Sequence, residues 1–245
     1  MEETIDDTAT RRSNINRLHD SILVAAWEAY HERSTSPEAF YARFYLEGKG
    51  KQPPSRVLHA IIFLQAWTAW DYRFREDGPL RALEFLPGFI EENSPTIQHL
   101  RDRSLLTLED DDINAIRDLA VSLESGLTFD DGRGPRRAPT AWGKLLHFLA
   151  PESILLWDGE TVRKGPLHLN DGPDDFAALQ RWGRALSRHL EKDRVGGYAG
   201  LAVAHRLQRK DSYEEPVTKI IDEAMYDPST IRQAIEIVGT PYELK

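Results

Sequence analysis

The sequence contains no cysteine, and this absence excludes several kinds of chemistry. Disulfide bonds, thiolate zinc sites, iron–sulfur clusters and cysteine nucleophiles all need a cysteine sulfur atom. The absence is compatible with a reducing cytosol, so we expect a cytoplasmic protein. Histidine is present, but none of the 8 histidines forms an HxxxH or HExxH pattern. We therefore predict no metal site and no cofactor.

Positively charged residues are fewer than negatively charged ones. The chain has 31 Lys and Arg against 40 Asp and Glu, which gives a formal net charge of -9 at pH 7. Binding to DNA or RNA phosphates needs clustered lysine and arginine. This balance argues against a protein whose whole surface binds nucleic acid, but a local basic patch on an acidic body is compatible with it.

Long hydrophobic runs are missing as well. The first ten residues are acidic and polar and do not have the basic start and apolar core of a signal peptide. The longest uncharged stretch, residues 57–70, is too short to span a bilayer. We expect no membrane association, a buried core helix at 57–70, and a disordered or frayed tail over residues 1–12.

The sequence does contain many amphipathic segments separated by proline and glycine. At 40% hydrophobic residues the chain can bury a sizeable core. Apolar residues at three- and four-residue spacing predict helices at 13–31 and 56–74. Further helices are expected to begin at the following residues: Pro37, Ser94, Thr107 or Glu109, Pro139 or Thr140, Pro173, Pro216 and Pro228. One more helix is expected after Gly200.

No run of alternating residues predicts a strand. We therefore predict the all-α class, with a single globular domain of about ten helices over residues 13–245. An internal boundary, if there is one, is expected near 126–139. Pro87-Gly88 is expected to break a helix, and residues 130–137 are expected to form a flexible connection.

The stretch from Ala138 to Lys164 contains the most distinctive pattern in the chain. Pro151 ends an apolar helix and can reverse the chain, which brings Asp158 back toward Lys144. Lys144 lies off the apolar stripe of its helix, so its side chain either extends into water or is partly desolvated. A desolvated lysine is a candidate amine nucleophile. Asp158 either caps the next helix, assists the amine, or does both.

Two runs within this stretch carry a resemblance. The run from Lys144 to Pro151 and the following Ile154 to Asp158 resemble the lysine–aspartate segment of helix-hairpin-helix DNA glycosylases. They also resemble bacterial helical proteins with a K-L-L-H-F-x-x-P pattern before an apolar-W-D. In the bifunctional glycosylases the lysine attacks the sugar C1′ atom. The resemblance covers about residues 138–164 and implies that Lys144 and Asp158 are catalytic.

The same resemblance implies a DNA-lesion substrate and N-glycosidic bond cleavage. Trp142 and Trp157 would then contact a base, and His147, one turn from Lys144, would also contact the substrate. A local basic patch would bind DNA phosphates through Arg136, Arg137 and Arg163. In the alternative interpretation the tryptophans belong to the core and the arginines are ordinary loop charges. The chain would then be a non-enzymatic helical domain that binds or regulates a protein partner.

Overall fold

The structure is a computed structural model of the full chain. It describes residues 78–130, 135–136, 139–158, 162, 165–193, 197–198, 200 and 216–244. The tail predicted at 1–12 lies outside these residues, as do the helices predicted at 13–31, at Pro37, at 56–74 and after Gly200.

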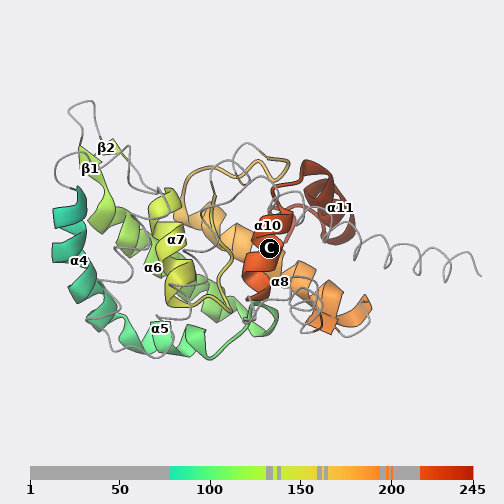
Figure 1. The fold of residues 1–245 in the computed structure, drawn as a ribbon, viewed down its shortest axis with the longest axis horizontal. Helices are drawn as coiled ribbons and strands as arrows, with labels where there is room; N and C mark the ends of the chain where they lie inside the picture. Colours follow the sequence, from blue (N-terminus) through green and yellow to red (C-terminus); the bar gives the residue numbers. More distant parts are fainter. Residues whose placement is uncertain are drawn as a thin grey trace, which may run out of the picture.

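The described residues are mainly helical. They form seven α-helices, which are α4 (Gly78–Glu92), α5 (Ser94–Arg101), α6 (Asp110–Leu127), α7 (Pro139–Leu149), α8 (Pro173–Asp193), α10 (Val217–Ala224) and α11 (Pro228–Val238) (Figure 1). A short 3₁₀ helix, η1 (Leu105–Thr107), joins α5 to α6. The predicted helical class is confirmed for this part of the chain, while the total of about ten helices stays a prediction.

Proline and acidic residues define several of the helix starts. Asp227 caps α11, because its carboxylate accepts hydrogen bonds from the backbone N–H groups of Ser229 and Thr230, each at 3.2 Å. The same helix ends at Gly239, whose φ of 83° lies in the region that favours glycine. The predicted start of this helix at Pro228 and its end at glycine are both confirmed.

The acidic run Glu109–Asp112 forms the start of α6, as the sequence predicted. Glu109 is the cap, and its backbone N–H donates to the Asp112 carboxylate at 2.8 Å. Asp112 also accepts from His99 Nε2 at 2.7 Å, and Asp110 pairs with Arg184 at 2.6 Å. These carboxylates therefore satisfy the positive end of the helix and tie it to its neighbours.

Helix α4 corrects one expectation, because it continues through Pro87 and Gly88 instead of breaking there. A proline inside a helix removes one N–H donor and costs about 3 kcal/mol. The face of α4 that carries Leu86, Phe89 and Ile90 is buried, and α4 packs against α6. Burial of this apolar face offsets the local cost of Pro87.

The connection between α6 and α7 corrects another expectation. It contains a short antiparallel pair, β1 (Phe129–Asp130) with β2 (Pro135–Arg136), in which Phe129 lies opposite Arg136. Strands of two residues are too short to show the alternation of apolar and polar residues that identifies a strand.

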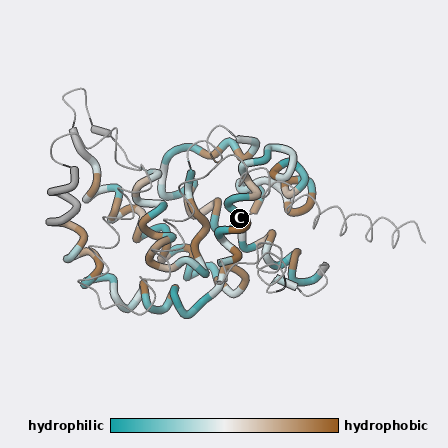
Figure 2. The backbone as a smooth tube through the Cα atoms, in the orientation of Figure 1, coloured by the Kyte–Doolittle hydropathy of each residue, from teal (hydrophilic) through white to brown (hydrophobic). Residues whose placement is uncertain are grey.

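The core lies between the helices, with α6 near its middle. Helix α6 contacts α4, α7 and α8, and α8 in turn contacts α11 and η1. In Figure 1, α4 lies at one end of this arrangement and α11 at the other. Figure 2 shows hydrophobic and hydrophilic residues mixed along the helices, and α8 buries an apolar stripe: Phe176, Leu179, Trp182, Leu186 and Leu190.

One cluster of buried residues extends from Leu86 in α4 to Ala234 in α11. It therefore includes residues on both sides of 126–139, where an internal boundary was expected. Within the described ranges, no helix has the length and apolar character needed to cross a membrane.

Candidate functional site

The site is built where the chain reverses after α7. The segment 154–158 runs back along α7 and approaches it closely at Gly143. A Cβ atom added to Gly143 would lie 2.5 Å from Cβ and 3.6 Å from Cα of Trp157. Only glycine allows this approach, and the approach brings Asp158 to the same region as Lys144.

Two buried side chains hold the returning segment in place. Gln180 of α8 binds the backbone of Leu155 on both sides, accepting from its N–H at 2.7 Å and donating to its carbonyl at 3.2 Å. His147 Nδ1 lies 2.6 Å from the carbonyl oxygen of Ile154. These bonds satisfy backbone groups that would otherwise be buried without partners.

Lys144 is buried, with only 6% of its surface exposed. The interpretation in which its side chain extends into water therefore does not hold. Burial lowers the pKa of the Lys144 amine, the charges of Asp158 and Asp222 oppose this effect, and the charge of Lys219 adds to it. The Asp158 charge therefore acts on the Lys144 amine, while the predicted catalytic role of the pair stays a prediction.

Asp158 is half-buried and has two structural contacts. Its side-chain Oδ2 accepts a hydrogen bond from the hydroxyl of Tyr226 at 2.8 Å. Its backbone carbonyl accepts from the N–H of Val162 at 2.9 Å, which is the spacing of a helical turn. The helix predicted to begin after Asp158 lies mostly outside the described residues, so its capping by Asp158 stays a prediction.

The short helix α10 supplies three charged residues that the sequence analysis did not single out. Lys219, Asp222 and Glu223 are each at most 1% exposed. The Lys219 Nζ atom lies 3.3 Å from Asp222 Oδ2 and 2.8 Å from Glu223 Oε1. In the sequence these residues share one face, opposite Val217, Ile220 and Ile221, so α10 has the pattern of an ordinary surface helix. Only the tertiary structure buries the charged face.

Asp222 has an unusual environment within this group. Burial raises its pKa to about 7, Lys219 opposes the effect, and the charges of Asp158 and Glu223 add to it. Its Oδ1 atom is buried and has no hydrogen-bond partner among the described residues. A buried acceptor without a partner is costly in a folded protein, and such atoms are concentrated at functional sites.

His147 was predicted to lie near the substrate. It is fully buried, and burial lowers its pKa to about 3, although its bond to the Ile154 carbonyl opposes the shift. The ring is therefore neutral near pH 7, and Nδ1–H donates to that carbonyl. This arrangement gives His147 a role in holding the returning segment.

Trp142 and Trp157 were predicted to contact a base, but both are fully buried. They pack around Phe176 of α8, with ring centroids 5.0 Å and 5.9 Å from it. Their indole N–H groups have no hydrogen-bond acceptor within the described part of the chain. Because their rings are enclosed by the core, this arrangement leaves no ring face on which a base could stack.

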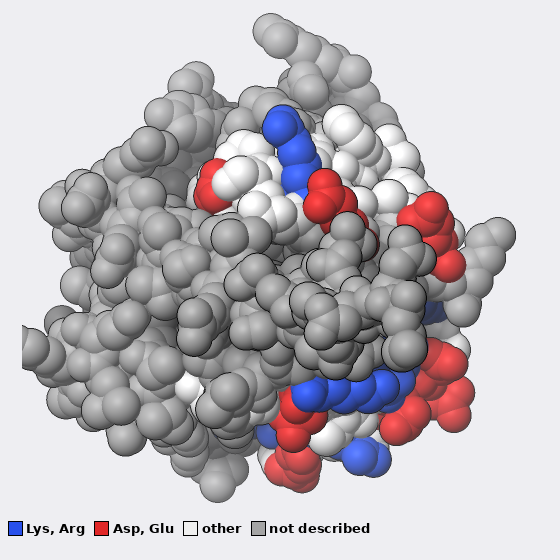
Figure 3. Space-filling view, turned by 90° about the vertical axis from the view of Figure 1, so that its right-hand side faces the viewer, with Lys and Arg blue, Asp and Glu red and all other residues white. Residues whose placement is uncertain are grey.

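The predicted basic patch falls mostly outside the described residues. Arg136 belongs to β2, but its side chain is not described, and Arg137 and Arg163 lie outside the described ranges. On the face in Figure 3, the described Lys and Arg side chains lie next to Asp and Glu. The patch therefore stays a prediction.

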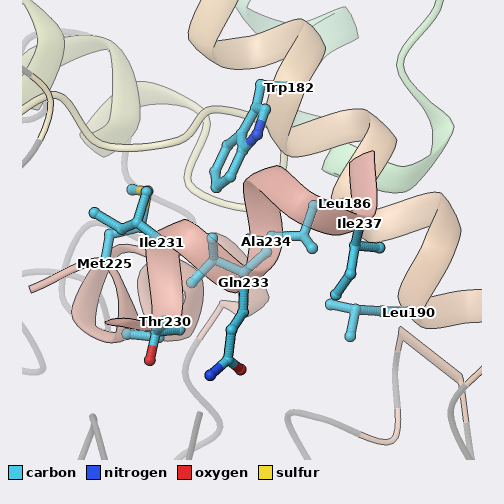
Figure 4. Close-up of a pocket in the computed structure, with 11 residues that line it drawn as sticks. Trp182, Leu186, Leu190, Met225, Thr230, Ile231, Gln233, Ala234 and Ile237 are labelled. Atoms are coloured by element: carbon cyan, nitrogen blue, oxygen red, sulfur yellow. The ribbon is translucent and has the colours of Figure 1, made fainter. Parts of the chain in front are cut away.

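A separate apolar pocket lies between α8, α10 and α11 (Figure 4). It contains about 450 Å³ of empty space, part of which is open to solvent, and Trp182 and Leu186 of α8 face Met225, Ile231 and Ala234 across it. Thr230 and Gln233 are at its edge. It contains neither Lys144 nor Asp158, so it is distinct from the site at α7.

No family model, curated protein or solved structure matches the chain. Any function must therefore be argued from the geometry of the site itself. Among the described residues, no group of three or more histidine, aspartate or glutamate side chains is placed to hold a metal ion. What they do provide is an amine with a lowered pKa beside a carboxylate, together with a buried carboxyl that titrates near neutral pH.

Proposed function

We propose that the protein acts on DNA lesions through the Lys144 amine, with Asp158 as its partner. The observation that supports this is the burial of Lys144 within reach of the Asp158 charge, where hydrogen bonds from His147 and Gln180 hold the returning segment. A lysine amine attacks carbon only in its neutral form, and burial favours that form. The likeness of residues 138–164 to the glycosylase segment supports the choice of substrate.

The reaction in this proposal is imine formation at the sugar. The neutral amine adds to C1′ of a damaged nucleoside, and the base leaves with the electrons of the C1′–N bond and takes one proton from the amine nitrogen. The C1′–O4′ bond then breaks, O4′ takes the second proton, and the imine forms at C1′. At an abasic site the amine adds to the C1′ aldehyde, whose oxygen leaves as water. The Asp158 carboxylate stabilises the positive charge that develops at C1′.

Borohydride trapping tests this function, because borohydride reduces an imine to a stable amine. Wild-type protein should form a covalent adduct with a duplex that contains an abasic site. Lys144→Gln should abolish the adduct, and Lys192→Gln, which removes an exposed lysine on α8, should retain it. An undiminished adduct in Lys144→Gln would remove Lys144 from the mechanism.

The second candidate is a non-enzymatic helical protein that binds or regulates a protein partner. The contacts of Asp158 with Tyr226 and Val162 favour it, because they give the aspartate a purely structural role. This candidate predicts no DNA binding, whereas phosphate binding must weaken as salt rises. A gel shift of labelled abasic duplex at low and high salt separates the two functions.

We also propose that residues 13–245 form one domain of about ten helices. The buried cluster shared by α4 and α11 supports this organisation.

A further inference from the structure

We propose that Asp222 of α10 is the proton partner of the Lys144 amine: it takes the proton that the amine must lose and returns it later in the reaction. The inference rests on the proposed role of Lys144 as a nucleophile. Because Asp222 exchanges a proton with the amine and with the hydroxyl that leaves, it is a catalytic acid–base residue in this proposal.

The geometry around Asp222 supports this role. Lys219, one turn earlier in α10, holds Oδ2 at 3.3 Å and so fixes the orientation of the carboxyl group. The other oxygen, Oδ1, is buried without a hydrogen-bond partner among the described residues, so it is available to accept a proton. Hydrogen bonds from Thr218 to the Pro151 carbonyl and from Tyr226 to Asp158 hold this region beside the turn after α7. The Asp222 charge raises the pKa of the Lys144 amine.

The other carboxylates near the amine are less suited to the task. Asp158 is half-buried and already accepts a hydrogen bond from Tyr226. Glu223 lies closer to Lys219, at 2.8 Å, than Asp222 does. Asp222 combines full burial with an acceptor atom that has no partner, and burial favours its neutral, protonated form.

Burial shifts the pKa values of both groups in the direction that favours proton transfer from the Lys144 amine to Asp222. The charged groups that act on Asp222 are Lys219 and Glu223 on its own helix and Asp158 on the returning segment. Their combined effect with burial places its pKa at about 7, while burial lowers the pKa of the amine on α7. A neutral amine beside a neutral carboxylic acid avoids two buried charges, which offsets the cost of moving the proton.

The Lys144 ammonium gives one proton to the Asp222 carboxylate and becomes a neutral amine. The amine nitrogen adds to an aldehyde carbon and forms a carbinolamine. The proton held by Asp222 then passes to the carbinolamine hydroxyl, which leaves as water, so the products are a protonated imine and the Asp222 carboxylate.

A small aldehyde tests this without DNA. The full-length protein is treated with propionaldehyde and cyanoborohydride from about pH 5 to about pH 9. The alkylation rate of Lys144 is measured by peptide mass spectrometry at each pH, and the rate of the exposed Lys192 in the same sample shows how an ordinary lysine responds to pH. The wild-type rate should fall on the alkaline side as Asp222 loses its proton near pH 7.

Two variants complete the test. Asp222→Asn should lose this alkaline decrease and react about 10²-fold more slowly below pH 7, because no acid remains to expel water. Glu223→Gln is the matched control on the same helix. In this variant the alkylation rate of Lys144 should still decrease at alkaline pH, but the decrease should begin at a lower pH than in wild type, because the Glu223 charge raises the pKa of Asp222.

A wild-type profile in Asp222→Asn overturns the proposal. If circular dichroism shows that Asp222→Asn does not fold, wild type and Glu223→Gln still test the proposal. It is overturned if the alkylation rate of wild type does not decrease at alkaline pH. It is also overturned if Glu223→Gln shows the decrease at the same pH as wild type. Alkylation that depends on Asp222 in a protein that forms no DNA adduct would support the proton partner and reject the DNA function. A DNA adduct together with alkylation that does not depend on Asp222 would support the DNA function and reject Asp222 as the proton partner.

Discussion

At the scale of single residues, position 147 shows how burial changes a common side chain. The folded protein holds His147 neutral because burial lowers its pKa from 6.5 to about 3. The unfolded chain takes up the proton near pH 6.5, so it binds more protons than the folded protein between these values. The free energy of unfolding therefore falls as pH drops through this range.

We predict that His147→Gln reduces this dependence on pH. At pH 7 the variant should also be less stable by about 1–3 kcal/mol, because the Ile154 carbonyl loses its donor in a buried site. Urea unfolding of both proteins at several pH values provides the measurement. A variant with the full acid dependence of wild type would show that another group is responsible.

Asp222 should change the free energy of unfolding with pH in the opposite direction to His147. Its pKa is raised from 3.8 to about 7, so the folded protein binds the extra proton between these values. Its contribution to stability is fully present below pH 3.8 and is lost as pH rises through about 7. The difference in unfolding free energy between wild type and Asp222→Asn should therefore shift in favour of the variant as pH rises from 4 to 8. A constant difference would contradict the raised pKa.

The sequence could predict part of this site at the residue level. The positions of Lys144 and Asp158 on either side of a proline turn indicated that they would lie close together. Burial of Trp142 and Trp157 was foreseen only as an alternative. The group on α10 was missed because Lys219 and Asp222 have the spacing of exposed residues on an amphipathic helix, and their burial depends on segments distant in sequence.

At the scale of elements, the contact between α7 and the returning segment depends on Gly143. We predict that Gly143→Ala destabilises the protein by about 1–3 kcal/mol, because the new methyl group would overlap Trp157. The same change should displace Asp158 and weaken any activity of Lys144.

Gly88→Ala is the matched control, since both glycines lie inside helices. A Cβ atom at Gly88 would meet nothing within 4 Å, so alanine should stabilise α4 by about 0.5–1 kcal/mol. Thermal unfolding should give a lower melting temperature than wild type for Gly143→Ala and a higher one for Gly88→Ala. Similar effects on both melting temperatures would mean that the close approach at Gly143 carries no cost.

Helix starts were the most predictable elements. Proline and acidic residues define them locally, as at Pro139, Pro173 and Pro228. The continuation of α4 through Pro87 could not be predicted in this way, because it depends on burial of the helix against α6.

At the scale of the whole molecule, the shared core predicts a single unfolding unit. Buried residues from α4 to α11 belong to one cluster, so the helices on either side of 126–139 should unfold together. Tryptophan fluorescence and circular dichroism should give coincident urea transitions. Two separate transitions would place a domain boundary in the connection between α6 and α7.

The most direct test of the central claim is to identify the residue that borohydride links to an abasic duplex. Peptide mass spectrometry of the trapped complex identifies that residue without relying on any variant. We expect the sugar to be attached to the amine of Lys144. Attachment to another lysine, or no adduct with a folded protein, would contradict the proposed function.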